Sequence, residues 1–172
     1  MKRISIHILA AVIPFILWTC KDDDSPSQPK HQYYLKMKVD GSLKEYDTCW
    51  LYGYSQPAPF ETNHINILAG RPGDYGGAAV NDTKAIGVGT YLHTMINPEI
   101  NIPMAGIGAY RAPGSSDIYL SHQAGWPLYE ATVTFTTFDS DVASGTFSGQ
   151  IRQVGGDVVL TITEGEFRAY IP

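Results

Sequence analysis

The fold class of this chain is decided by residues 130–138, which read EATVTFTTF. Apolar and polar side chains alternate here, so that Ala131, Val133 and Phe135 share one face of the segment. A period of two residues is typical of a β-strand with one buried face. The stretch therefore predicts a strand of an antiparallel sheet that covers a core.

The sequence after this stretch predicts three more strands. Ser144–Gln153 is followed by Gly155-Gly156, which predicts a tight hairpin turn, and then by Val158–Thr163. A final strand is expected at Glu166–Ile171, with Gly165 forming a bulge or bend before it.

The sequence before residue 130 shows the same alternation in shorter segments, separated by turn residues such as Asp40-Gly41. The expected strands are Tyr34–Val39, Ser42–Asp47, Cys49–Tyr54, His64–Ala69, Val88–Leu92, Ala105–Tyr110 and Asp117–Leu120. We expect the last two to pair, whereas the remainder of residues 73–103 gives little indication of structure. About nine or ten short strands predict one all-β domain over residues 33–172, an antiparallel β-sandwich or partly open barrel without a long helix.

Residues 1–19 have the layout of a secretory signal peptide. Lys2 and Arg3 precede the apolar run Ile8–Trp18, which is too short to cross a bilayer. Residues 20–32 follow, and their part Ser25–Gln32 has two prolines and no apolar residue. This composition predicts a flexible tether between the signal peptide and the domain.

The end of the signal, Leu17-Trp18-Thr19-Cys20, resembles a bacterial lipobox. The resemblance implies a diacylglycerol on the Cys20 thiol, cleavage before Cys20 and acylation of the new amino group. The following residues, Lys21, Asp22, Asp23 and Asp24, are similar to the acidic export signal of Bacteroidetes-type surface lipoproteins. Together these resemblances imply a lipid-anchored protein of the outer membrane that faces the cell exterior.

Two further segments resemble a family of small Bacteroidetes-type lipoprotein domains of unknown function. One is Met37–Gly41, and the other combines Gly145–Gly149 with Leu160–Phe167. In that family a Gly-Thr-Phe strand pairs with an Ile-Thr-x-Gly-x-Phe strand at the C-terminal end. The resemblance implies a β-sandwich at the cell surface, with Phe147 and Phe167 in the core, and it implies no activity.

Charge and cysteine content exclude several classes of function. The chain has a net charge of −5, and cleavage of the signal removes Lys2 and Arg3, which leaves −7. Nucleic-acid binding requires basic patches, so no nucleic-acid partner is expected, and the lipid on Cys20 is the expected membrane contact. Cys49 is then the one remaining cysteine, which excludes an internal disulfide and favours a buried, unreactive thiol.

Trp50, Tyr52 and Tyr54 alternate along one predicted strand, so all three project from the same face. If that face is open, the aromatic rings form a platform for sugar rings or a partner protein. If it is buried, they belong to the core. The core interpretation is simpler, because Leu51 is the one apolar side chain on the opposite face.

Trp126 is the strongest candidate for a contact residue, because it lies in a loop-like segment bracketed by glycine and proline. His122 and Tyr129 are close in sequence and would add polar groups to an aromatic patch. The alternative is that this tryptophan closes the end of the sandwich as a packing residue.

No metal, cofactor or catalytic motif is recognisable in the sequence. The histidines lack metal-ligand spacing, and no Gly-x-Ser-x-Gly nucleophile elbow is present. We therefore expect a non-catalytic surface lipoprotein that binds a glycan or a protein. A structural or accessory subunit of an envelope complex is the alternative, and a hydrolase is the third possibility.

Overall fold

The computed structural model of the chain describes residues 32–55, 63–97, 102–123 and 125–172. These residues belong to one compact unit, His31–Pro172. In chain order the strands are β1 (Tyr34–Val39), β2 (Ser42–Tyr46), β3 (Cys49–Ser55), β4 (Asn63–Arg71), β5 (Asp74–Asp82), β6 (Gly89–Leu92), β7 (Ile96–Asn97), β8 (Ile102–Pro103), β9 (Ala105–Ile107), β10 (Tyr119–Leu120), β11 (Ala131–Phe138), β12 (Val142–Gln153) and β13 (Val159–Tyr170).

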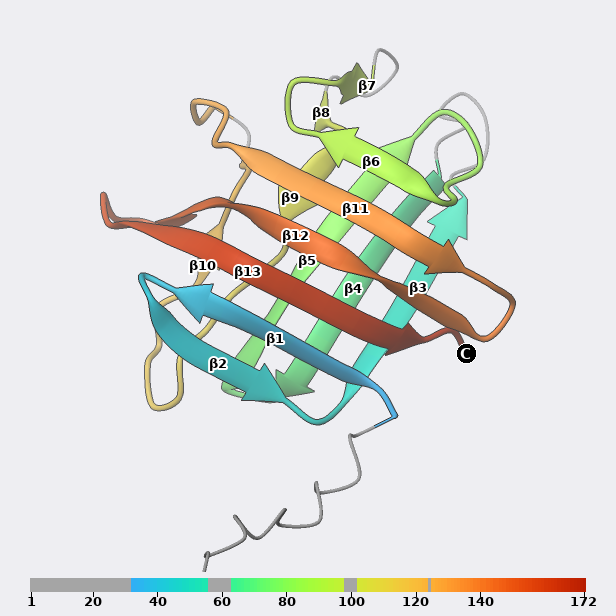
Figure 1. Cartoon of the computed structure of the whole chain (residues 1–172). Helices are drawn as coiled ribbons and strands as arrows, with labels where there is room; N and C mark the ends of the chain where they lie inside the picture. The colour runs from blue at the N-terminus through green and yellow to red at the C-terminus, as the bar shows by residue number, and fades with distance from the viewer. Residues whose placement is uncertain (1–31, 56–62, 98–101, 124) are drawn as a thin grey trace, which may run out of the picture. The chain divides into compact units, whose positions relative to one another are not determined.

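The strands form two layers that cross one another (Figure 1). One layer runs β6-β11-β12-β13 and continues into the β1–β2 hairpin, and the other runs β3-β4-β5-β9. The layers are joined where Tyr170, the last residue of β13, pairs in parallel with Trp50 of β3. The chain is thus all-β and sandwich-like, as the alternation in the sequence predicted.

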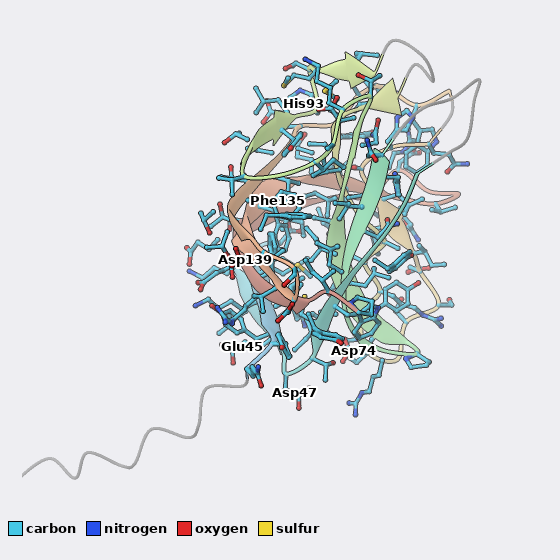
Figure 2. All side chains as sticks on the ribbon, turned by 90° about the vertical axis from the view of Figure 1, so that its right-hand side faces the viewer. Glu45, Asp47, Asp74, His93, Phe135 and Asp139 are labelled. Carbon is cyan, nitrogen blue, oxygen red and sulfur yellow. The ribbon has the colours of Figure 1, made fainter. Side chains whose placement is uncertain are left out.

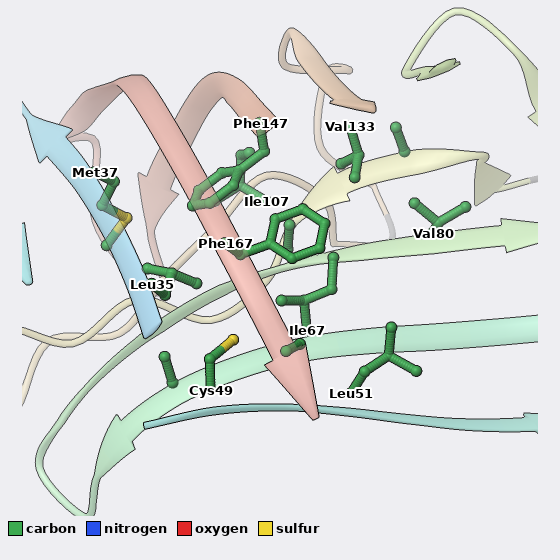
Figure 3. Packing of buried hydrophobic residues seen from close by; sticks show 14 of the residues in the cluster. Leu35, Met37, Cys49, Leu51, Ile67, Val80, Ile107, Val133, Phe147 and Phe167 are labelled. Atoms are coloured by element: carbon green, nitrogen blue, oxygen red, sulfur yellow. The ribbon is translucent and has the colours of Figure 1, made fainter. Parts of the chain in front are cut away.

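Both layers turn their apolar faces toward a shared core. The side chains of Ala131, Val133 and Phe135 in β11 are each at most 1% exposed, in agreement with the predicted buried face. Figure 2 shows Phe135 between the two layers. Its ring meets that of Phe167 edge to face, with 5.5 Å between the centroids, an arrangement that aromatic pairs prefer. Figure 3 shows how residues of both layers, among them Leu35, Ile67 and Val80, pack around Phe167.

Two glycine–phenylalanine pairs interlock β12 with β13. Gly145 stands opposite Phe167, and Phe147 stands opposite Gly165. A Cβ on Gly145 would lie 2.9 Å from the Phe167 ring, and a Cβ on Gly165 would lie 2.8 Å from the Phe147 ring. Each glycine therefore provides the space that the phenylalanine across from it occupies, and both rings are buried in the core as expected.

The predicted irregularity near Gly165 is confirmed, but it does not end a strand. The pairing of β13 with β12 slips between Phe147 and Gly149, and its pairing with β1 slips between Lys36 and Lys38. Glu164 adopts a φ of 50° at this point. The two strands expected at the C-terminal end are thus one strand, β13, with a bulge inside it.

β5, β7 and β8 were not predicted, so the described residues hold more strands than expected. β5 reads DYGGAAVND, and glycine and alanine have low strand propensity. Its glycines instead allow close packing, because a Cβ on Gly77 would lie 2.0 Å from the carbonyl oxygen of Ile67 in β4. The expected pairing of Ala105–Tyr110 with Asp117–Leu120 is limited to an isolated bridge between Tyr110 and Tyr119, because β9 pairs with β5 and β10 pairs with β12. Within the described part of the chain, no helix is long and apolar enough to span a membrane.

Candidate ligand site at the tip of the β12–β13 hairpin

Trp126 lies in the segment between β10 and β11, and this segment folds against the β12–β13 hairpin. The guanidinium carbon of Arg152 lies 5.2 Å from the centroid of the Trp126 ring, within the range of a cation–π contact. Tyr129 meets the same ring edge to face, with 6.5 Å between centroids. The tryptophan is half-buried, so it is both held in place and accessible.

The side chain of Arg152 is fixed by the hairpin turn that follows it. Its Nε donates a hydrogen bond to the carbonyl oxygen of Gly156 at 2.9 Å. Its guanidinium group also pairs with the carboxylate of Asp157, whose side chain is 96% exposed. Gly155 makes the turn possible because its φ is 77°, a conformation that favours glycine. The turn therefore holds the guanidinium against Trp126, and the Asp157 carboxylate that pairs with it remains exposed to solvent.

These groups enclose a shallow depression of about 160 Å³, lined by Trp126, Arg152, Gly155, Gly156 and Asp157. The lining combines an aromatic ring, a cation, a carboxylate and glycine backbone. Pockets for drug-sized ligands are larger, roughly 300–1,000 Å³. The depression thus suits a ligand that inserts one small unit, and its polar groups can orient that unit by hydrogen bonds.

The rim of the depression is apolar. Leu128, Val154, Val158 and Val159 are between 40% and 50% exposed. Val154, Val158 and Val159 belong to the β12–β13 hairpin, and Leu128 follows Trp126 by two residues, so the two segments that line the depression also carry exposed apolar side chains. These side chains add apolar surface that a larger partner could contact.

His122 is not among the residues that line the depression. Its side chain is half-buried, and its Nδ1 has no hydrogen-bond partner among the described residues. Arg152 and Asp157 take the expected role of polar groups beside Trp126, and neither was predicted from the sequence. The one signal for Arg152 was its position three residues before Gly155, near a predicted hairpin turn that brings strand ends together.

The core interpretation of the Trp50–Tyr54 face is wrong for Trp50 and Tyr52. Their side chains are 38% and 43% exposed, whereas Leu51 between them is 3% exposed. Cys49 joins Leu51 on the buried face and makes that face apolar, so the aromatic residues point outward. The side chain of Tyr54 lies outside the described residues.

Two aromatic residues that were not predicted extend this exposed face. Tyr170 pairs with Trp50 across the seam of the two layers and is 43% exposed. The ring of Tyr33 lies 5.5 Å from that of Tyr170. We call Tyr33, Trp50, Tyr52 and Tyr170 the aromatic stripe.

The polar and titratable side chains of Cys49, Tyr46 and Asp74 make contacts that stabilise the fold. Burial raises the pKa of the Cys49 thiol to about 12, so the thiol stays protonated. The Tyr46 hydroxyl donates to an Asp74 oxygen at 3.3 Å, and burial, followed by the Asp74 charge, raises the pKa of that phenol. No group of three or more potential metal ligands occurs in the described ranges. Cys20 and the expected export signal Lys21–Asp24 lie outside them.

Comparison with known proteins returns no relative. No family model matches the chain, and no curated protein or solved structure matches it. Its chemistry is therefore inferred from its own residues.

Proposed function

We propose that this protein is a lipid-anchored, non-catalytic binding module that holds a glycan at the depression beside Trp126. The observation that carries the proposal is the Trp126–Arg152 contact at 5.2 Å, with Arg152 fixed by the hairpin turn. An aromatic ring next to fixed hydrogen-bonding groups is the combination that a small polar ligand with an apolar face requires.

A sugar ring has such a face, because its axial C–H groups pack on an aromatic ring while its hydroxyls point outward. Tyr129 and Trp126 would supply the apolar surface. Arg152 would donate to ring hydroxyls or a carboxylate, and Asp157 and the glycine carbonyls would accept. A volume of about 160 Å³ fits one unit of a longer chain, which would continue over the rim.

A binding role is favoured over glycoside cleavage by the carboxylates at the site. Hydrolysis of a glycosidic bond commonly uses two carboxyl groups on either side of the bond. Asp157 is the single carboxylate among the five residues that line the depression. It is also 96% exposed, whereas the general acid of a glycosidase is commonly held in an apolar environment.

The anchor is inferred from the sequence. The signal peptide, the lipobox-like Cys20 and the acidic residues Asp22–Asp24 favour attachment to the outer membrane on the exterior side. The tether would then present the domain to ligands outside the cell.

A protein ligand is the second candidate, and the apolar rim favours it. Leu128, Val154, Val158 and Val159 offer contact area that a single sugar unit does not need. In that case the protein would act as an accessory subunit of an envelope complex, with Trp126 and Arg152 as the central contacts.

The test is a screen of residues 32–172 against polysaccharides and glycoproteins, with two variants at the site and two matched controls. Trp126→Ala should abolish binding. Arg152→Gln should weaken it roughly 10- to 100-fold, because a hydrogen bond from a charged donor contributes about 1.5–3 kcal/mol. Trp50→Ala and Arg168→Gln change the same residue types elsewhere and should bind as the unmodified domain does.

Circular dichroism would verify that each variant is folded. A blank result from the folded domain would overturn the glycan proposal. Loss of binding in Trp50→Ala with retention in Trp126→Ala would move the site to the aromatic stripe.

A further inference from the structure

The aromatic stripe is an exposed surface that is not part of the proposed ligand site. Trp50 and Tyr52 project from β3, and Tyr170 projects from the adjacent end of β13 on the same face. Tyr33 continues the stripe through its ring contact with Tyr170. Four large aromatic side chains thus form one continuous outer surface.

The stripe and the ligand site lie at opposite ends of β13. Val159, the first residue of this strand, belongs to the rim of the depression, and Tyr170, its last, belongs to the stripe. Eleven residue steps of about 3.3 Å place these two ends roughly 35 Å apart. Figure 1 shows the β12–β13 hairpin tip and the C-terminus at opposite sides of the molecule.

The chain runs from the tether into the domain at the stripe. Tyr33 is itself a stripe residue, and Tyr34, the first residue of β1, pairs with Arg168 near the end of β13. Twelve residues lie between Cys20 and Tyr33. A flexible segment of this length has a mean end-to-end distance of about 20 Å. With the proposed anchor at Cys20, the tether would therefore attach to the domain at the stripe.

The chemistry of the stripe suits a lipid headgroup layer. Trp and Tyr have an apolar ring and a polar group, and they concentrate at membrane–water interfaces for this reason. Arg168, which is exposed beside Tyr170, adds a cation that can contact phosphate. A short tether also raises the local concentration of lipid around the domain, so that weak contacts are enough to keep the stripe at the membrane surface.

We propose that the aromatic stripe rests on the lipid headgroup layer and orients the domain so that the Trp126 depression points away from the membrane. The inference depends on the proposed anchor at Cys20. It adds that the tether and the stripe act together, because the tether limits the distance and the stripe fixes the orientation. A free domain should have little affinity for the same surface.

The test uses the two tryptophans of the mature chain as position reporters. Residues 20–172 are coupled through Cys20 to a maleimide lipid in phosphatidylcholine vesicles, and Cys49 stays uncoupled because it is 3% exposed. Trp126→Phe leaves Trp50 as the sole tryptophan, and Trp50→Phe leaves Trp126. Lipids brominated near the headgroup quench a tryptophan that lies in the interface.

We expect Trp50 emission to shift to shorter wavelength and to be quenched several-fold more strongly than Trp126 emission. Replacing Tyr52 and Tyr170 by serine in the protein with Trp50 alone should remove most of that quenching. The matched control, Val154→Ser and Val158→Ser at the far end, should leave it unchanged. Uncoupled protein with Cys20→Ser should show little quenching.

Equal quenching of the two tryptophans, or stronger quenching of Trp126, would overturn the proposal. The chemical coupling supplies the anchor, so this result is independent of whether cells acylate Cys20, and failure of the natural anchor is seen separately by cell fractionation. Quenching of Trp50 that a soluble polysaccharide competes away would identify the stripe as a glycan surface and would also overturn the proposal.

Discussion

Replacing Gly165 by alanine tests the interlock between β12 and β13. A Cβ at this position would lie 2.3 Å from the carbonyl oxygen of Phe147 and 2.8 Å from its ring. The ring can rotate but the backbone oxygen cannot, so the two strands must separate locally. Overpacking of this kind costs about 1–3 kcal/mol, and the reduced freedom of the unfolded chain returns about 0.4–1 kcal/mol. We expect a net loss of about 1–2 kcal/mol.

Urea unfolding of residues 32–172, followed by circular dichroism, measures this loss. A change of about 1–2 kcal/mol corresponds to a fall in Tm of roughly 2–8 °C in a domain of this size. Gly87→Ala is the matched control, because nothing lies within 4 Å of a Cβ at Gly87 and its φ is not in the left-handed region. That variant should gain about 0.4–1 kcal/mol.

The interlock would be refuted if Gly165→Ala unfolded within about 0.5 kcal/mol of the unmodified domain, the range typical of surface substitutions. A second variant, Phe147→Leu combined with Gly165→Ala, should recover only part of the loss, because the backbone contact remains. Full recovery would show that the ring, and not the strand spacing, is the constraint.

Three further predictions concern single residues. Cys49, whose pKa burial raises to about 12, should resist iodoacetamide at pH 8 in the folded domain and react in urea; rapid native alkylation, read by mass spectrometry, would contradict its burial. Burial also raises the pKa of Tyr46, so the folded state retains this proton more strongly than the unfolded state. The resulting stability is complete below pH ~10 and declines as the pH rises further. Urea midpoints should therefore fall less between pH 9 and 11 in Tyr46→Phe than in the unmodified domain, and equal slopes would argue against this role. Cys20→Ala should release the protein from membrane fractions or leave it uncleaved, and retention of mature-size protein in membranes would contradict lipidation.

The fold class was predictable because alternation is a local signal. β11 buries Ala131, Val133 and Phe135 as its sequence pattern requires. β5 was not predictable, because its glycines serve contacts with β4 and with Met37, which only the assembled sheet supplies. The two C-terminal strands are one for a similar reason, since β1 and β12 pair on both sides of the bulge and carry the strand through it.

The candidate site was predictable only in part. Trp126 was a candidate because it lies in a loop-like segment. Its partner Arg152 belongs to a strand and lies 26 residues later, and no local sequence pattern connects the two residues. Alternation showed that Trp50 and Tyr52 share a face without showing which face. That was decided by the contact of β3 with β13, because the pairing of Trp50 with Tyr170 fixes the outer side of the sheet.

The most direct test of the proposed ligand site is a ¹⁵N–¹H spectrum of residues 32–172 during titration with polysaccharides. Trp50 and Trp126 are the two tryptophans of this domain, so their indole N–H signals report on the two ends of the molecule in one experiment. We predict that a bound polysaccharide shifts the Trp126 indole signal and leaves the Trp50 signal in place. A shift of Trp50 alone, or of neither signal with any polysaccharide, would contradict a glycan site beside Trp126.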